Sequence, residues 1–266
     1  MTTGTTTDAV LARWNRFRTN RNHALAAEHG WLTLTSLQWL PTEPSPMDLV
    51  PGLWRTDGTA AFLTASEADG LTLVETGEPV VGELKAVLAN EESLMWVRHG
   101  STVVELAVRG GRYALRTRDS ASPTLRGFTA VPTFDYRPDL VVEGRFEAYP
   151  RPRTVPIGTA YPRVGSEAVL VGDVVFELDG TEYRLAAEEE KLGALVITFH
   201  DGTNGSTNDH WRKLETTRPR PDGTVVLDFN RAINYPSAFT DYGTCPVPVE
   251  GNRIGVPVEA GEKRPR

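Results

Sequence analysis

The chain has 266 residues and a mass of 29.2 kDa, which is long enough to bury a large core without disulfides or metal ions. Its 28 basic and 35 acidic residues give a net charge of −7, whereas a nucleic-acid groove needs clustered excess Lys and Arg. We therefore expect no nucleic-acid partner. Cys245 is the single cysteine, so an intramolecular disulfide and a multi-cysteine zinc site are excluded.

The first eight residues are Thr-rich and lack the basic start and apolar run of a secretory signal. No stretch of the chain approaches the roughly 20 apolar residues that a membrane helix needs. We expect a cytoplasmic protein with no membrane partner.

The first regular element is expected to be a helix from Asp8 to about His29, after a disordered segment at residues 1–7. Val10, Leu11 and Trp14 begin an apolar stripe with helical spacing, and Gly30 is a suitable C-terminal stop. Residues 32–40 are expected to form a short strand or a turn of helix. The proline-rich residues 41–51 are typical of a surface loop.

From residue 71 onward the pattern predicts strands. Residues 102–108 and 113–117 flank Gly110-Gly111, and residues 174–178 and 182–185 flank Asp179-Gly180, which are two favoured hairpin turns. Further strands are expected at 94–97, 140–149, 194–199 and 225–229. We predict a mainly β fold of antiparallel sandwich or barrel-like sheets with an N-terminal helix.

Four prolines in residues 150–162 suggest a linker. We expect a tail and helix at residues 1–30, one β unit at 31–150 and a second at 151–266 that carries the site. One continuous domain is the alternative.

Several common catalytic motifs are absent from the sequence, among them the Gly-x-Ser-x-Gly elbow, the phosphate loop, the dinucleotide fingerprint and His-Glu-x-x-His. We expect no cofactor and no metal. The nearest candidate for a metal site combines His200, Asp201, Asp209 and His210, but no spacing rule selects this set.

Polar side chains concentrate in the C-terminal third. FHDGTNGSTNDHWRKL, at residues 199–214, is expected to be a strand, a polar loop and a returning strand, in which Asp201 and Arg212 bind substrate. The alternative is a plain hairpin in which Asp201, Thr203 and Asn204 satisfy the turn amides. In LDFNRAINYPSAF, at residues 227–239, strand alternation would place Asp228 and Asn230 on one face and Arg231 on the other. Arg231 then needs a partner, because an unpaired buried guanidinium is very costly.

Two further segments contribute candidates. Cys245 in YGTCPVP is either a nucleophile activated by a nearby cation or an inert core residue. In LRTRD, at residues 115–119, Arg116 and Arg118 share a strand face and Asp119 ends it. Paired guanidiniums favour an anionic ligand, and cross-strand pairing with Glu105 is the structural alternative.

The order and spacing of FHDGTNG, LDFNRAINYPSAF, YGTCPVP, Asn252 and AGEK at residues 260–263 resemble the bacterial family called domain of unknown function 1684. Weaker agreement at GWLTLTSLQWL, residues 30–40, and at LRTRD suggests that the family covers nearly the whole chain. The family name implies no activity. The resemblance adds Asn234 and Glu262 to the residues of interest.

Three functions are compatible with these residues. The first is a cofactor-independent enzyme for a small polar or anionic metabolite, with Asp228, Arg231 and Cys245 as catalytic groups. Its substrate contacts would be Arg116, Asp119, Asp201, Arg212, Asn230, Asn234 and Glu262. The second is a β-sandwich protein that binds a small anion without chemistry. The third is a purely structural network. A homodimer is left open.

Overall fold

The computed structural model describes residues 3–265, and its contacts divide the chain into two compact units. The first unit contains the chain up to His23, Thr129–Phe239 and the segment from Cys245 onward. The second contains Ala24–Phe128 and Thr240–Thr244. These boundaries fall at residues other than 30 and 150, and the expected three-part division into domains stays a prediction.

Helix α1 is the one long helix among residues 3–265, and it spans Thr3–Leu25. It begins five residues earlier than the sequence indicates, so residues 3–7 are helical rather than disordered, and residues 1–2 lie outside the described chain. Within the first unit, Trp14 Nε1 of α1 donates to Asn230 O at 3.1 Å, and Phe17 contacts Arg231. The helix ends at Leu25, before the expected end near His29, and Gly30 is not its stop, because its φ is −75° and its N–H donates to Ala27 O in the following turn.

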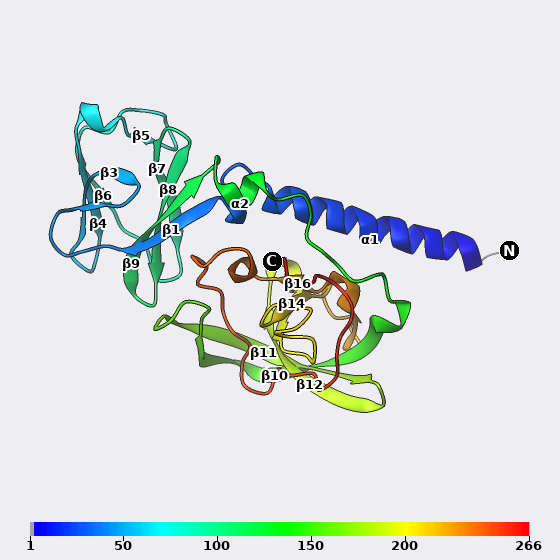
Figure 1. Ribbon diagram of the computed structural model, residues 1–266. Coiled ribbons are helices and arrows are strands. Elements are labelled where there is room, and N and C mark those ends of the chain that lie inside the picture. The colour runs from blue at the N-terminus through cyan, green and yellow to red at the C-terminus, as the bar shows by residue number, and fades with distance from the viewer. Residues whose placement is uncertain (1–2, 266) are drawn as a thin grey trace. The chain divides into compact units, whose positions relative to one another are not determined.

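The second unit consists of two antiparallel sheets (Figure 1). The five-stranded sheet has the order β1-β9-β8-β7-β5, with β1 at Leu34–Trp39, β5 at Thr72–Leu73, β7 at Ser93–His99, β8 at Thr102–Arg109 and β9 at Arg112–Asp119. The four-stranded sheet has the order β2-β3-β4-β6, with β2 at Ser45–Met47, β3 at Val50–Thr56, β4 at Ala61–Ala65 and β6 at Gly82–Ala86.

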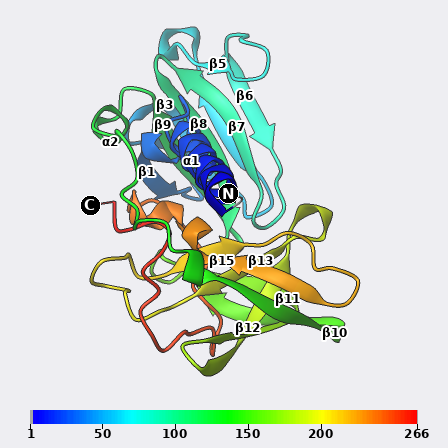
Figure 2. The same cartoon turned by 90° about the vertical axis from the view of Figure 1, so that its right-hand side faces the viewer.

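One apolar core joins these two sheets. Trp54 and Leu63 of the four-stranded sheet belong to the same buried cluster as Leu106 and Leu115 of the five-stranded sheet. The arrangement is the predicted sandwich. Strand β2 lies inside the segment expected to be a loop, and β3 and β4 were not predicted. In β3, Pro51 and Gly52 interrupt the apolar run. Figure 2 shows β7 and β8 of the five-stranded sheet from the side.

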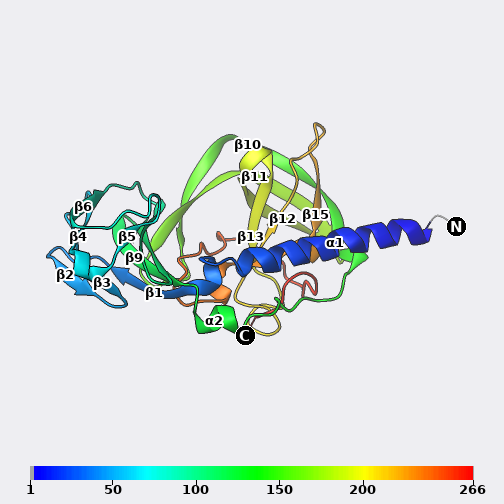
Figure 3. The ribbon, with the colours of Figure 1, turned by 90° about the horizontal axis from the view of Figure 1, so that it is seen from above.

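The first unit contains a single seven-stranded antiparallel sheet of order β15-β10-β11-β12-β13-β14-β16. Its strands are β10 at Val141–Gly158, β11 at Gly165–Leu178, β12 at Thr181–Glu189, β13 at Leu195–Phe199, β14 at Arg212–Glu215, β15 at Thr224–Asp228 and β16 at Ile233–Asn234. Figure 3 shows the strong curvature of β10 and β11, yet the sheet stays open between β15 and β16 and forms no closed barrel.

The expected linker at residues 150–162 is mostly strand. β10 runs to Gly158, and Pro150 and Pro152 fall in the register shift between Ala148 and Arg153, where they interrupt no ladder bond. On its other edge, β10 pairs with β15 only over Val141–Arg145. Pro156 lies beyond this stretch, so no strand pairs with it on that edge.

Both predicted hairpins are confirmed, and the two central residues of each turn have positive φ, namely 55° and 72° at Gly110-Gly111 and 53° and 70° at Asp179-Gly180. The short helices are α2 at Pro123–Arg126 and six 3₁₀ turns: Trp31–Thr33, Glu67–Asp69, Pro138–Leu140, Lys191–Gly193, Phe229–Arg231 and Pro236–Ala238. Within residues 3–265, no helix is long and apolar enough to cross a bilayer.

Candidate functional site

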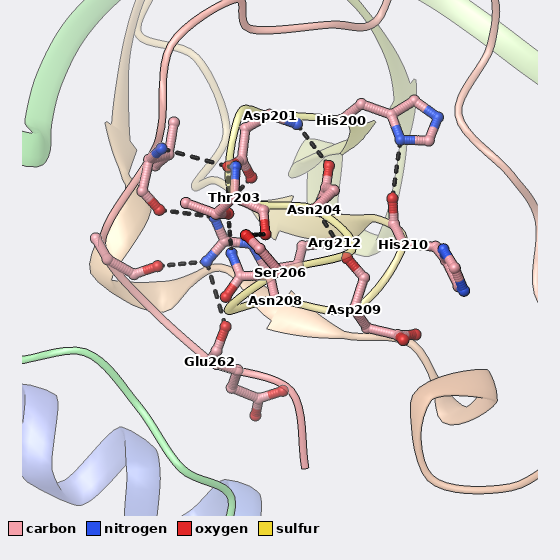
Figure 4. A network of polar contacts seen from close by, with 12 residues as sticks. His200, Asp201, Thr203, Asn204, Ser206, Asn208, Asp209, His210, Arg212 and Glu262 are labelled. Atoms are coloured by element: carbon pink, nitrogen blue, oxygen red, sulfur yellow. Dashed lines mark hydrogen bonds and ion pairs between the residues drawn. The ribbon is translucent and has the colours of Figure 1, made fainter. Parts of the chain in front are cut away.

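The polar loop between β13 and β14 is organised around a buried ion pair. Asp201 Oδ2 accepts from Arg212 Nη2 at 2.8 Å, and neither side chain is exposed (Figure 4). The other oxygen, Asp201 Oδ1, accepts from the N–H of Thr203 at 2.8 Å and from its hydroxyl. One carboxylate therefore caps the turn and neutralises the guanidinium of the returning strand.

Arg212 has no donor left for a ligand. Its Nη2 also donates to Val258 O, and its Nη1 donates to Ala260 O and Glu262 O. With its amide oxygen toward the guanidinium, Asn208 accepts from Arg212 Nε at 3.0 Å and donates to Glu262 O at 3.0 Å. Burial lowers the pKa of Arg212, while Asp201 and Glu262 oppose this effect. The residue fixes the C-terminal segment against β14.

Glu262 connects three segments of the first unit. Its Oε1 accepts from Arg21 Nε of α1 at 2.9 Å, and its Oε2 accepts from the N–H of Asn234 in β16 at 2.7 Å. Asn234 in turn donates through Nδ2 to Lys263 O. Gly261 is required before it, because φ is +77° and a Cβ there would lie 2.8 Å from Phe229 O and closer still to Ala232 O.

Asn252 fills a gap in the same sheet. Strands β12 and β13 pair only at Glu188 and Glu189, and beyond that point the Asn252 side chain bridges them. Its Oδ1 accepts from Ala186 N at 2.8 Å, and its Nδ2 donates to Ala186 O and Thr198 O. An amide side chain thus replaces a missing stretch of strand pairing.

The predicted alternation of residues 227–231 is wrong after Asp228, because β15 ends there and Phe229–Arg231 form a 3₁₀ turn. Asp228 Oδ1 caps this turn by accepting from the N–H of Asn230 at 3.2 Å and from its Nδ2 at 2.9 Å. Asn230 Oδ1 accepts from Arg137 N, and Nδ2 also donates to Arg137 O. The amide is saturated by the scaffold.

Arg231 is exposed rather than buried, and its guanidinium lies 4.5 Å from the ring centre of Phe17 in α1. The cation–π contact supplies the partner that the sequence argument required for Arg231. Cys245 is buried, and its carbonyl accepts from Ala160 N at 2.8 Å. Asp228 and Arg231 are thus each engaged by separate neighbours.

The cavity lined by Glu262 and Asn230 has a volume of about 10 Å³. That is room for about one water molecule and not for a metabolite. The four residues of the metal hypothesis also diverge, since Asp201 pairs with Arg212 and His200 Nδ1 contacts His210 O at 2.9 Å. Among residues 3–265, no three His, Cys, Asp or Glu side chains gather as metal ligands.

The first unit also contains a larger hollow that the sequence did not predict. It has a volume of about 380 Å³ and lies among β10, β11, β12 and the turn at residues 249–252. Its charged wall is already paired: Asp173 accepts from Tyr149 Oη at 2.5 Å and from Arg184 Nη1 at 3.1 Å, and Arg184 also donates to Glu147. Burial, followed by the contact with Asp173, raises the pKa of Tyr149.

The second unit holds a buried cluster on β8 and β9, which we call the arginine cluster and define as Glu105, Arg116 and Arg118. Glu105 lies directly opposite Arg116 in the ladder, and the three side chains are 1–4% exposed. Arg116 Nη1 donates to Glu105 Oε1 at 3.1 Å, and Arg118 Nε donates to Oε2 at 2.7 Å. The sequence thus correctly placed both arginines on one strand face, and the expected cross-strand carboxylate is present.

The two arginines differ in how completely they are satisfied. Arg118 also donates through Nη1 to His29 O and Gly30 O, so all three of its nitrogens are engaged. Arg116 Nη2 donates to the hydroxyl of Thr244 at 2.7 Å, but its buried Nε has no hydrogen-bond partner. The guanidinium carbons lie 4.8 Å and 5.8 Å from the Trp31 ring centre, for Arg118 and Arg116 respectively. The sequence did not predict that Thr244 and Trp31 contact the arginine cluster, because both residues are distant from LRTRD along the chain.

The arginine cluster carries an unbalanced charge. Burial alone would raise the pKa of Glu105, but Arg118 and Arg116 hold it below its ordinary value of 4.5, so the carboxylate is ionised at neutral pH. Two positive charges then face one negative charge, and the nearby Arg109 adds no net charge because it pairs with Glu91 at 3.7 Å. Asp119 supplies no counter-charge to the arginine cluster. Its carboxylate instead caps the end of β9 by accepting from Ser101 Oγ at 2.8 Å and from Ala121 N at 2.9 Å. The bond from Ala121 N lowers the pKa of Asp119 most, and the bond from Ser101 lowers it further.

The C-terminal network lies within a segment of the chain that matches a protein family. The family model described as protein of unknown function (DUF1684) matches residues 126–263, just over half of the chain. The chain belongs to the DUF1684 family. The matched segment contains Asp201, Arg212 and Glu262, whereas LRTRD and GWLTLTSLQWL lie upstream of it.

One solved structure similar to this DUF1684 member is the solution NMR structure of an uncharacterized protein of Haloarcula marismortui. It is 30% identical, covers 53% of this chain and 80% of its own, and superposes with a TM-score of 0.45. No curated protein matches the sequence significantly.

Proposed function

We propose that this protein binds a small anion, a carboxylate or phosphate, at the arginine cluster of its second unit. The observation that carries the proposal is Arg116, a buried guanidinium with one unpartnered N–H beside a single carboxylate shared with Arg118. Buried donors without partners cost free energy, and buried charges are normally paired. A bound anion would satisfy both requirements.

The surroundings of this site support an anion rather than a solvated charge. Glu105, Arg116 and Arg118 are the only buried charged side chains of the second unit. The cluster lies on the face of β8 and β9 opposite the one that carries Leu106 and Leu115, which belong to the apolar core. Stability alone does not require charges on this face, because well-packed apolar side chains often replace a buried ion pair without loss of stability. Arginines at central strand positions therefore support a binding role.

The C-terminal motif favours a scaffold role instead. Asp201 pairs with Arg212, Glu262 accepts from the N–H of Asn234, and Asn230 bonds to Asp228 and to the backbone of Arg137. The cavity lined by Asn230 and Glu262 has a volume of only about 10 Å³. Catalysis by Asp228, Arg231 and Cys245 therefore remains a hypothesis without a geometric argument in its favour. We rank binding ahead of catalysis for this reason.

The proposal is tested by thermal unfolding with sodium acetate, phosphate and sulfate at constant ionic strength. Ligand binding stabilises the folded state by about 2.7 kcal/mol at a hundredfold excess over Kd, and this stabilisation raises Tm. We expect at least one anion to raise Tm in the wild type and this rise to vanish in Arg116→Lys, which loses the fork of donors. Arg98→Lys, an arginine in β7 of the same sheet, is the matched control and should keep the rise.

Two results would overturn this function. The first is the absence of any Tm rise with all three anions. The second is an equal rise in Arg116→Lys and the wild type, which would move the site elsewhere, for instance to the hollow beside Arg184.

A further inference from the structure

Because the charges of the arginine cluster can be counted, we infer that its ligand is a monoanion, and specifically a monocarboxylate rather than a dianionic phosphate or sulfate. The inference rests on the proposed function and adds the class of ligand. It starts from the finding that, of the charged side chains of the second unit, two arginines and one glutamate are buried. Their sum is a single positive charge.

The charge sum limits the ligand because the site is buried. A monoanion brings the cluster to neutrality, whereas a dianion leaves one uncompensated negative charge among side chains that are at most 4% exposed. Uncompensated charge is expensive where water cannot screen it. Trp31, which lies against both guanidiniums, offers an aromatic face that disfavours excess negative charge.

The donor geometry fits a carboxylate. Nε and Nη2 of a guanidinium lie on the same edge and match the two oxygens of a carboxylate. In Arg116 this edge is half used: Nε is unpartnered, and Nη2 contacts only the Thr244 hydroxyl. The remaining nitrogen, Nη1, is held by Glu105, which fixes the orientation of the edge.

Thr244 occupies the acceptor position that a bound carboxylate would take at Arg116 Nη2. It belongs to Thr240–Thr244, a segment without strand or helix that packs with the second unit although its chain neighbours do not. A carboxylate that takes the place of the Thr244 oxygen at Nη2 replaces one hydrogen bond to a neutral hydroxyl with two hydrogen bonds to an ionised acceptor. The threonine hydroxyl can then donate to the ligand, because a hydroxyl carries its own hydrogen.

The test compares Kd values of acetate, benzoate and sulfate, measured by calorimetry with the full chain at constant ionic strength. We expect both carboxylates to bind at least about tenfold more tightly than sulfate, since one net charge in a buried site distinguishes them. Sulfate is chosen because it stays a dianion across the working pH range.

Two charge variants make the inference falsifiable independently of the wild-type result. In Glu105→Gln the cluster carries two positive charges, so the preference should reverse toward sulfate. In Arg118→Gln the net charge is zero, so the affinity for acetate should fall by at least about tenfold. If Glu105→Gln does not fold, Arg118→Gln alone still tests the charge count, because its remaining Glu105–Arg116 pair is neutral.

The outcomes separate this inference from the function on which it rests. Sulfate binding as tightly as acetate in the wild type overturns the monoanion inference but leaves anion binding intact. An unchanged preference in both charge variants also overturns it. If no anion binds at all, the proposed function fails and the ligand class fails with it.

Discussion

Glu105 faces Arg116 directly across the β8–β9 ladder and accepts from Arg118 with its other oxygen, so one carboxylate serves two guanidiniums. The pairing follows from the hairpin turn. With Gly110-Gly111 as a two-residue turn, every pair of opposite residues is fixed, and Glu105 must lie opposite Arg116. This shared carboxylate determines how the cluster responds to mutation.

Loss of Glu105 should be much more harmful than loss of Arg116. We expect Glu105→Gln to destabilise the protein by about 3–5 kcal/mol, because two buried guanidiniums remain without a counter-charge. Arg116→Met leaves a neutral Glu105–Arg118 pair and should cost less than about 1.5 kcal/mol. Urea unfolding of both variants measures the difference, and equal losses would show that the cluster is not positively unbalanced.

The lowered pKa of Glu105 predicts acid sensitivity. A carboxylate whose folded pKa lies below its ordinary value contributes stability that is present above pH 4.5 and is lost as the pH falls through the folded pKa. The free energy of unfolding should therefore fall below pH 4.5 more steeply in the wild type than in Glu105→Gln, by up to about 1.4 kcal/mol per pH unit. Parallel curves in urea titrations between pH 3 and 6 would contradict this assignment.

Arg212 is predicted to act through stability. Arg212→Lys loses most of the acceptors among Asp201, Val258, Ala260 and Glu262 and should cost about 3–5 kcal/mol. The neighbouring Lys213 makes a surface pair with Glu215, so Lys213→Gln should change stability by less than about 1 kcal/mol. Arg212→Lys with wild-type stability but altered ligand affinity would place the residue in a binding site instead.

Gly261 and Gly205 form a matched pair of glycines with φ of +77° and +75°. Both alanine variants should lose about 1–2 kcal/mol to the left-handed backbone. Gly261→Ala should lose at least about 2 kcal/mol more, because its Cβ would meet the Phe229 and Ala232 carbonyls, whereas Gly205 faces open space. Thermal unfolding of the two variants checks this, and similar losses would refute the steric requirement.

Local patterns in the sequence predicted the hairpins, the antiparallel sheets and the placement of Arg116 and Arg118 on one face. These features depend on turn chemistry and on the two-residue period of a strand. The same period misplaced Arg231, because the Asp228 side chain caps a 3₁₀ turn that ends the strand. Thr244 reaches Arg116 from 128 residues away along the chain, a contact that no local pattern encodes.

The most direct test of anion binding is the NMR signal of the Arg116 Nε–H group during an acetate titration, assigned by its loss in Arg116→Lys. We predict a saturable downfield shift of this resonance, while the Nε–H signals of Arg118 and Arg212, which already have acceptors, stay within line width. An Arg116 resonance that does not move at saturating acetate, phosphate or sulfate would contradict the proposed site.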